Sequence, residues 1–348
     1  MQTQRFILAM VLLVLFGAFQ EGAAQQRHRH HNPFHNAPEG VIVPPLNPEG
    51  TTLHTQQLGD GVYALVSDKP PVDNAGFVVG EKGVLVIDAH INPAMARQIQ
   101  DAVRAVTDKP ILYLVNTNFH GDHTFGNATF PASTTIIAHY ATAEIMMDFE
   151  EEWRLQLANM GGDTSVLEGI EPRLPDVTFE DYLRVDLGGK IVEVHHFGPG
   201  NTPGDAVVYV PDTRTAWTGN LVLGTGLMPP IFEGKTEQYL QSVSRFAATL
   251  QSTVIVPGHG GLTDSRQLGR YMDYLNTLLG DVRRAVAEGK TLDETLAALP
   301  LGSGWLPASD SPLAGFVPFL EGLHRLNVQQ TYFDYTTRRQ TVALDQTW

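Results

Sequence analysis

The 348-residue chain contains no cysteine. This absence excludes a disulfide scaffold, thiolate zinc sites, iron–sulfur clusters and cysteine nucleophiles. Basic residues are also scarce: 23 lysines and arginines stand against 38 aspartates and glutamates, which gives a formal net charge of −15. Because such an acidic surface repels phosphate backbones and anionic lipid headgroups, we expect no nucleic-acid partner. With 43 % hydrophobic and 18 % charged residues, the composition is that of a folded protein with one large domain or two ordinary ones.

The first residues of the chain have the features of an export signal. Arg5 supplies a positive charge, an apolar run extends from Phe6 to Phe19, and small residues at 22–24 offer a cleavage point. The run is about 14 residues long, which suits the roughly 7–15 residues of a signal peptide and is short of the ~20 that span a bilayer. We therefore expect residues 1–24 to be removed, which leaves a periplasmic or secreted protein without a membrane span. An uncleaved anchor is the alternative.

The rest of the chain divides into a linker, one main domain and an extension. Residues 25–50 are rich in proline and are expected to form a linker. The linker contains four histidines, which form either a weak metal scavenger or a solvated polar tail: His28, His30, His31 and His35. We place the main domain at 51–265, with a lid-like insertion at 146–187, and a helical C-terminal extension at 266–348.

Short apolar runs typical of β-strands alternate with amphipathic helical segments from residue 52 onward. We expect strands at 62–66, 75–79, 83–88, 111–115, 134–138, 191–194, 206–210, 215–218 and 253–256. We expect helices at 92–106, 236–250 and 264–288. This alternation predicts an α/β protein whose sheets are buried between helical layers.

Polar side chains of the kinds that bind ligands are concentrated directly after the predicted strand at 111–115. Asn118, His120, Asp122 and His123 lie within six residues of one another, and Gly121 allows the loop between them to turn tightly. Two imidazoles, a carboxylate and a carboxamide at the end of a strand are costly to gather unless something binds there. We therefore interpret this loop as a binding site rather than as a solvated connection.

This loop resembles the metal-binding loop of the metallo-β-lactamase superfamily, whose general form is His-x-His-x-Asp-His. The resemblance extends over residues 52–262 and implies an αββα sandwich of two mixed β-sheets flanked by helices, with a helical extension at the C-terminus. It also implies a metal-dependent hydrolase of a small molecule. Four further similarities follow in the family's order, namely an acid that supports the metal loop from behind, a second metal loop, the position of a bridging aspartate and a last metal histidine: Asp88, 198–205, Asn220 and His259.

The chain departs from the family pattern at three ligand positions. Asn118 and Asn201 stand where the family has histidines, and Asn220 stands where it has the bridging aspartate. The first metal position therefore keeps only His120, which we treat as the candidate ligand of a weak first site. Because a carboxamide oxygen is a poor zinc ligand beside an imidazole nitrogen, we expect this first site to be empty or weak.

The second metal position keeps Asp122, His123 and His259. Three nitrogen and oxygen ligands with one open position are typical of a catalytic zinc, which lowers the pKa of a bound water from ~16 to ~7. Asn220 is expected to be a weak additional ligand or to hydrogen-bond that water. We predict about one zinc ion; iron is the alternative, because two histidines and one carboxylate also suit a non-haem iron.

The resemblance favours hydrolysis of a small ester, lactone or β-lactam. Single-zinc carbapenem-hydrolysing members of the family also carry asparagine at the position of Asn118. By this resemblance the catalytic residues would be Asp122 with the metal, His120 in proton transfer, and Asn118 or Asn201 as hydrogen-bond donor to the oxyanion. Two other functions stay open: a catalytically degenerate member that binds a ligand, and a mono-iron oxidoreductase. The sequence does not indicate an oligomeric state.

Several other residues lie where they are able to contribute to the site. His195 or His196 is a candidate to replace the ligand missing at Asn201, whereas we expect His90 and His139 to be structural. We expect the walls of a substrate pocket to come from the insertion and from 228–232. The insertion supplies four apolar candidates: Met146, Met147, Trp153 and Met160.

Overall fold

The structure of the chain is a computed structural model, which describes residues 33–336 apart from residues 35, 43–44, 70, 308–309 and 311–313. The predicted signal peptide and the histidines of the linker lie outside the described residues. None of the helices within the described part is both long enough and apolar enough to cross a membrane. Export and cleavage of the signal stay predictions.

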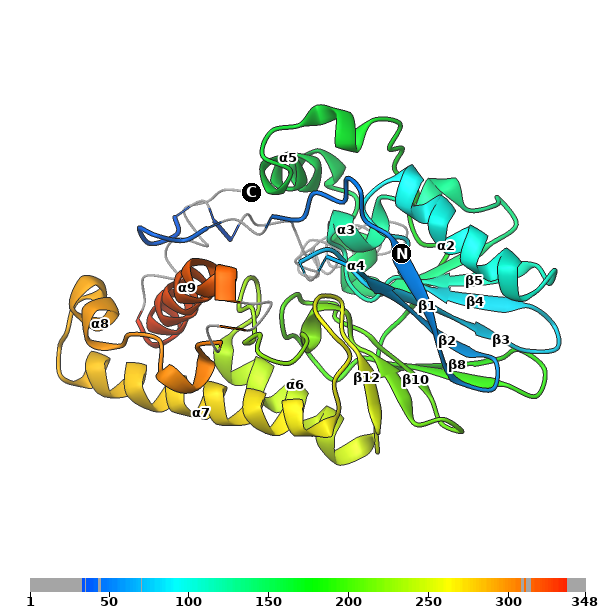
Figure 1. The fold of residues 1–348 in the computed structure, drawn as a ribbon. Coiled ribbons are helices and arrows are strands. Elements are labelled where there is room, and N and C mark those ends of the chain that lie inside the picture. Colours follow the sequence, from blue (N-terminus) through cyan, green and yellow to red (C-terminus); the bar gives the residue numbers. More distant parts are fainter. Residues whose placement is uncertain are drawn as a thin grey trace, which may run out of the picture.

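Two mixed β-sheets lie face to face in the molecule (Figure 1). The first has seven strands in sequence order: β1 (Leu53–Gly59), β2 (Val62–Ser67), β3 (Ala75–Val79), β4 (Val84–Ile87), β5 (Ile111–Val115), β6 (Thr135–His139) and β7 (Val177–Phe179). The second has five, ordered β12-β11-β10-β9-β8: β8 (Tyr182–Asp186), β9 (Ile191–His195), β10 (Val207–Val210), β11 (Thr215–Trp217) and β12 (Val254–Val256). Strands β4 to β7 pair in parallel, as do β11 and β12, while the other pairs are antiparallel.

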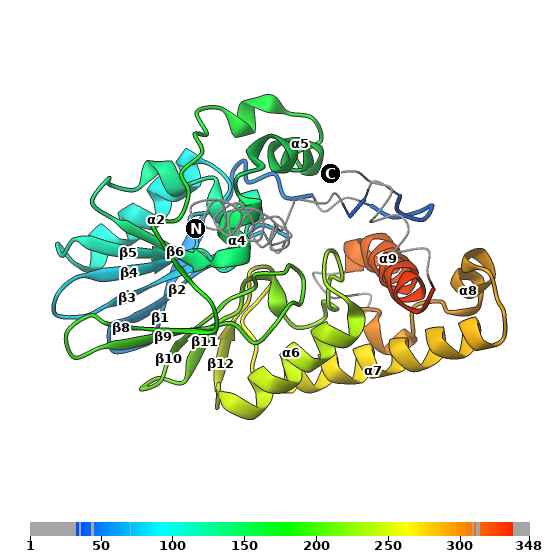
Figure 2. The same ribbon diagram turned by 180° about the vertical axis from the view of Figure 1, so that it is seen from behind.

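Helices cover the outer faces of both sheets (Figures 1 and 2). Helix α2 (Pro93–Val106) packs on the first sheet, while α6 (Thr236–Thr249) and α7 (Ser265–Ala287) pack on the second. The described residues form five further helices: α3 (Gly121–Thr124), α4 (Tyr140–Ile145), α5 (Phe149–Asn159), α8 (Leu292–Ala298) and α9 (Val317–Tyr335). The result is the predicted αββα sandwich, and the helices from α7 onward provide the expected C-terminal helical region.

The central strands are buried on both faces, which explains their continuous apolar sequences. All four residues of β4 and all four of β10 are buried. Side chains from the inner faces of the two sheets form one apolar cluster, which includes Val78, Val194 and Trp217. Burying each such side chain contributes roughly 1.5–3 kcal/mol relative to leaving it exposed. This cluster fixes how the two sheets, which carry different parts of the site, lie against each other.

Helix α2 shows how local signals and packing agree. Its N-cap Asn92 accepts a hydrogen bond from the Met95 amide at 3.0 Å, and Pro93 occupies the first turn, where its missing N–H is not needed. The buried residues recur at helical spacing and face the first sheet: Met95, Ala96, Ile99 and Val103. The helix predicted at 92–106 is therefore confirmed.

Two parts of the structure differ from the expectation. The insertion at 146–187 contains β7 and β8, which pair with β6 and β9 and so belong to the two sheets rather than to a lid. Both strands are short, and β8 fully buries only Val185, so no apolar run marks them. Strand β1 was missed for a similar reason, since its central residues are polar and exposed.

The predicted linker is also more than a free connection. Its described residues run beside α9, where Gln329 donates a hydrogen bond to the Asn36 carbonyl at 2.7 Å and Arg325 donates one to Glu39 at 3.0 Å. At its other end, the Leu46 amide donates to Asn159 at the end of α5 at 3.3 Å. The proline-rich composition indicated only the absence of regular structure and gave no sign of these long-range contacts.

We predict that a methyl group at Gly76 destabilises the packing of the two sheets. A β-carbon at residue 76 in β3 would overlap the indole of Trp217, which is buried between the sheets. Gly76→Ala should therefore lower the free energy of unfolding by about 1–3 kcal/mol in urea titrations. The matched control is Gly269→Ala in α7, where nothing lies within 4 Å and alanine should stabilise the helix by up to about 1 kcal/mol. Equal stability of the Gly76 variant and the unchanged protein would contradict the prediction.

Candidate metal centre

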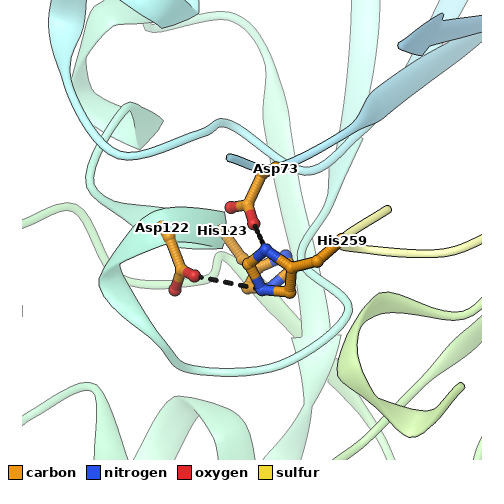
Figure 3. A group of neighbouring side chains, drawn as sticks. All are labelled: Asp73, Asp122, His123 and His259. Atoms are coloured by element: carbon orange, nitrogen blue, oxygen red, sulfur yellow. Dashed lines mark ion pairs between the residues drawn. The ribbon is translucent and has the colours of Figure 1, made fainter. Parts of the chain in front are cut away.

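Four side chains that can bind a metal converge at one edge of the sandwich (Figure 3). Asp73 directly precedes β3, Asp122 and His123 lie on α3 after β5, and His259 follows β12. One ligand atom from each of the four lies within 4.8 Å of those of the other three. The group therefore joins loops from both sheets.

His259 lies between two carboxylates. Its Nδ1 is 2.8 Å from Asp73 Oδ1 and 2.9 Å from the carbonyl oxygen of Pro71, and its Nε2 is 3.4 Å from Asp122 Oδ2. With a proton on Nδ1 directed to these acceptors, the lone pair of Nε2 faces the cluster. Asn74 stabilises the loop that carries His259, because its side chain donates hydrogen bonds to the carbonyl oxygens of Pro257 and Gly260 on either side of the histidine.

His123 is held in the same way by a different carboxylate. Its Nδ1 is 3.0 Å from Asp88 Oδ2, and its Nε2 is 3.2 Å from the side-chain oxygen of Asn220. Asp88 also accepts hydrogen bonds from the Thr117 amide and hydroxyl, so it supports the metal loop from behind, as the family resemblance implies. Outer carboxylates that fix the tautomer and orientation of metal-binding histidines are usual around metal sites.

Asn220 reaches the cluster from the second sheet. It lies in a short 3-10 turn after β11, and the buried hydroxyl of Tyr239 on α6 donates to the carbonyl oxygens of Asn220 and Leu221 at 3.2 and 2.9 Å. The Gly258 amide donates to the carbonyl of Gly219 at 2.8 Å. The turn that carries Asn220 and the loop that carries His259 are thus fixed relative to each other.

The charges of the cluster fit a cation. Burial raises the pKa of Asp73 well above its ordinary value, and the neighbouring Asp122 carboxylate raises it further. Burial opposes protonation of His123, yet the carboxylates of Asp73, Asp88 and Asp122 raise its pKa to about 10. Neither carboxylate oxygen of Asp73 has a hydrogen-bond partner within the described chain, apart from the ion pair with His259. A divalent ion would supply the positive charge that these carboxylates need, and the nitrogen and oxygen donors suit zinc or non-haem iron.

The structure brings the predicted ligands Asp122, His123 and His259 together, with Asn220 beside them. The sequence analysis missed Asp73. The only signal was a polar pair, Asp73 and Asn74, directly before a buried strand, and no motif spacing connects it with the loop at 118–123. Its place in the cluster depends on how the turn before β3 packs against the loop after β12.

The residues of the first metal position have other partners. The side-chain oxygen of Asn118 accepts from the His120 amide at 2.8 Å, and the side-chain amide of Asn201 donates to the Pro230 carbonyl at 3.0 Å. His120 is not part of the four-residue cluster, and its Nδ1 lies 3.5 Å from a carboxylate oxygen of Glu152 on α5. Each asparagine thus makes one hydrogen bond that stabilises its loop, whereas the side-chain nitrogen of Asn118 and the side-chain oxygen of Asn201 have no hydrogen-bond partner among the described residues. Loss of the first metal site stays a prediction.

A cavity opens beside the metal-binding cluster. His120, Asp122, Asn220 and His259 form part of its lining, whereas Asn118 and Asn201 are fully buried behind it. Their predicted role as donors to an oxyanion therefore receives no support from their positions. Asn220 is the carboxamide of the predicted set that reaches the cavity.

The walls of this cavity correct the prediction made for the insertion. From α5 the lining residues are Leu155, Gln156 and Asn159, while Pro230 and Phe232 come from the predicted segment 228–232. The four apolar residues expected here lie elsewhere: Met160 and Trp153 pack with the core under α2, Met147 is exposed, and Met146 lines a separate pocket. The face of α5 that looks into the cavity carries polar residues at helical spacing, which in the sequence resemble a solvated face.

Four other histidines in the described part of the chain, which the sequence placed near the site, do not belong to the cluster. His90 is buried, its Nδ1 accepts from the Ile91 amide, and its Nε2 contacts the Asp73 carbonyl at 3.2 Å. Burial lowers the pKa of His90 to about 3, so the ring stays neutral and supports the backbone of Asp73. His196 stacks on His139 with ring centroids 3.9 Å apart, and neither His195 nor His196 replaces the ligand missing at Asn201.

Residues 69–259 match the family model of the metallo-beta-lactamase superfamily, and the chain therefore belongs to this superfamily. It is 23 % identical over 299 residues to the linear primary-alkylsulfatase of Pseudomonas sp. (strain ATCC 19151), a match that covers 74 % of this chain and 55 % of that protein. The chain thus spans about half the length of this relative.

Two solved structures show the same fold. The metallo-beta-lactamase from Pontibacter korlensis has a TM-score of 0.52 at 18 % identity, with 65 % of this chain and 99 % of that chain covered. The sec-alkylsulfatase Pisa1 from Pseudomonas sp. has a TM-score of 0.59 at 15 % identity, with 81 % and 50 % covered. At these identities the likeness establishes the architecture and leaves the substrate to the site itself.

We predict that the purified chain binds about one divalent ion, expected to be zinc. Asp122→Ala should abolish binding because it removes the carboxylate that faces both histidines, and Asp73→Asn should weaken it by about 10–100-fold. Asn118→Ala is the matched control and should keep the metal. Elemental analysis and competition with a chelator measure these effects. Two tightly held ions, or none in the unchanged protein, would contradict the assignment.

The buried Asp205 gives a separate prediction on pH. Burial raises the pKa of Asp205 to about 6, although the Thr202 hydroxyl and amide donate hydrogen bonds to it. The folded protein thus holds this proton more tightly than the unfolded chain, whose pKa is near 3.8. The associated stabilisation is present below about pH 4 and is lost as the pH rises through 6, up to about 3 kcal/mol in total.

Asp205→Asn should remove this pH-dependent component. The free energy of unfolding of the variant, relative to the unchanged protein, should therefore rise between pH 4 and pH 7 by up to about 3 kcal/mol. Urea titrations at several pH values measure this difference. Asp108→Asn, at an exposed position, serves as the control and should follow the unchanged protein. A constant difference across this range would show that Asp205 titrates normally.

Proposed function

We propose that this chain is an exported hydrolase that uses one catalytic zinc ion to cleave the acyl C–O or C–N bond of an ester, a lactone or a β-lactam, with water attacking the carbonyl carbon. Membership of the metallo-beta-lactamase superfamily, together with a hydrolase among the relatives, supports a metal-dependent hydrolase in general terms. The observation that carries the proposal is the position of Asp122, His123, His259 and Asn220. Ligand atoms of Asp122, His123 and His259 lie within 4.8 Å of one another, and Asn220 contacts His123. Asp122, His259 and Asn220 line the adjoining cavity, whereas His123 is fully buried.

When bound, the metal supplies Lewis acidity and lowers the pKa of a water, so that hydrolysis proceeds near neutral pH. The side chains of the protein orient the substrate carbonyl and the two metal-binding histidines. Asn220 lines the cavity next to the cluster, and we assign to it the contact with the substrate carbonyl oxygen, in place of Asn118 or Asn201. The outer carboxylates of Asp73 and Asp88 keep His259 and His123 in the orientation that presents Nε2 to the cluster.

His120 is placed to accept or deliver the proton. It lines the cavity, and neither ring nitrogen makes a hydrogen bond within the described chain, apart from the ion pair with Glu152. Burial lowers the pKa of His120, but the carboxylates of Glu152, Asp122 and Glu233 together outweigh this effect and raise the pKa above its ordinary value. Glu152 is itself fixed, because it accepts from the Gly121 amide at 2.6 Å and from Gln156 at 2.8 Å. The imidazole is thus held against the metal loop by α5.

Two alternatives rest on particular observations. The set of Asp122, His123 and His259 also suits a non-haem iron, which favours a mono-iron oxidoreductase as the second candidate. The stabilising hydrogen bonds of Asn118 and Asn201 favour a member that has lost catalysis and binds its ligand without turnover. Oxygen consumption by iron-loaded protein would identify the first, and failure to turn over any ester, lactone or lactam would identify the second.

We predict that zinc-loaded protein hydrolyses at least one member of a panel of esters, lactones and a chromogenic lactam. His120→Gln should lower kcat by about 10²–10⁴-fold while the bound zinc is retained, because the variant loses proton transfer but no metal ligand. His195→Gln, outside the cluster and the cavity, is the matched control and should keep the rate. Steady-state kinetics with parallel elemental analysis measure both. An unchanged kcat in His120→Gln would remove this residue from the mechanism.

A further inference from the structure

The cavity beside the metal-binding cluster is mostly apolar. Half of its eighteen lining residues are leucine or phenylalanine, and three more are proline. The polar lining consists of four residues at the candidate site and two residues of α5: His120, Asp122, Asn220, His259, Gln156 and Asn159. The cavity thus has a polar end, formed by residues of the candidate metal site, and an apolar remainder.

The apolar walls come from segments that are far apart in the sequence. Phe34 and Leu46 belong to the N-terminal segment, and Phe319 and Leu323 belong to α9. Figures 1 and 2 show this segment, in dark blue, running between α5 and α9. Hydrogen bonds connect it with both helices, and a β-carbon at Gly322 of α9 would lie 2.8 Å from the Gly40 carbonyl oxygen. The N-terminal segment is therefore fixed to both helices, and the apolar wall is part of the folded structure.

The part of the cavity lining that the structure describes carries no lysine or arginine, and so no fixed positive charge. The carboxylates of Asp73 and Asp122 would balance the two charges of a divalent ion, and the carboxylates of Asp88 and Glu152 face His123 and His120 rather than an open position for a ligand. Because burying an unpaired charge among apolar groups costs several kcal/mol, an anionic tail or headgroup is strongly disfavoured here.

We infer that the substrate is an uncharged ester or lactone with an apolar tail, and that the tail lies in the cavity between the N-terminal segment and α9. This inference rests on the proposed function, since the reacting carbonyl must lie at Asn220 and His120 for the tail to extend along the apolar walls. Each methylene that enters the cavity leaves water, whereas a charged group in the same place loses its hydration without gaining a partner. The cavity therefore selects both length and neutrality.

The test compares p-nitrophenyl esters with the full chain loaded with zinc. From acetate through butanoate and hexanoate to octanoate, kcat/KM should rise about threefold to fourfold per added methylene until the cavity is filled. The monoester of suberic acid is the matched probe for charge, because it equals the octanoate ester except for a carboxylate at the end of the tail. Its kcat/KM should be at least about 100-fold lower than that of the octanoate ester.

A substitution in α9 tests whether the apolar tail lies against this helix. Phe319→Ala should lower the ratio of kcat/KM for octanoate to that for acetate by about tenfold, because it removes one apolar wall of the cavity. Leu306→Ala, at an exposed position outside the cavity, is the control and should leave the ratio unchanged. An unchanged ratio in Phe319→Ala would show that the tail lies elsewhere.

A binding measurement separates failure of this inference from failure of the proposed function. Calorimetry with octanamide and with suberamic acid, which carries a carboxylate at the far end, measures tail recognition without turnover. Binding of octanamide alone supports the inference even if no ester is hydrolysed, in which case only the proposed function fails. Hydrolysis without a preference for longer or uncharged tails would overturn the inference and leave the hydrolase standing. Equal binding of both amides, or binding of neither, would also overturn it.

Discussion

The site depends on the repulsion among buried carboxylates. Asp73, Asp88 and Asp122 surround two imidazoles, and the side chains come from segments before β3, after β4, after β5 and after β12. Without a cation the carboxylates of these acids repel one another, and a proton on His123 neutralises only part of their negative charge. The packing of the two sheets therefore holds these carboxylates together in spite of their repulsion. A cation that binds there would remove this repulsion, so its binding free energy would also stabilise the folded state.

The fold was largely predictable because its central strands are buried on both faces and its helices have clear ends, as Asn92 and Pro93 show for α2. The candidate ligands Asp122, His123 and His259 were predictable because they resemble the motifs of a known family. Asp73, the polar face of α5 and the edge strands β7 and β8 were not, because each owes its place to tertiary packing. No local pattern distinguishes Asp73 from a surface aspartate, and Glu152 and Gln156 read as residues of a solvated helix face.

The replaced ligands and the apolar cavity have related consequences. Asn118 and Asn201 make loop hydrogen bonds, and one possible metal-binding group lies among the described residues, with mostly apolar surface beside it. Much of the binding free energy for a substrate must then come from desolvating its apolar part, which is nondirectional. Asn220 and His120, at the polar end, would set the orientation of the carbonyl group.

The described residues of the N-terminal segment and of α9 do not belong to the metal-binding cluster, whose members lie between residues 73 and 259. They contribute much of the apolar wall instead, and they are held to each other by Gln329, Arg325 and the close crossing at Gly322. Mutations in these outer segments would therefore reshape what the protein accepts while the ligand geometry is preserved. Divergence toward new substrates could proceed at the two ends of the chain without passing through forms that have lost the metal.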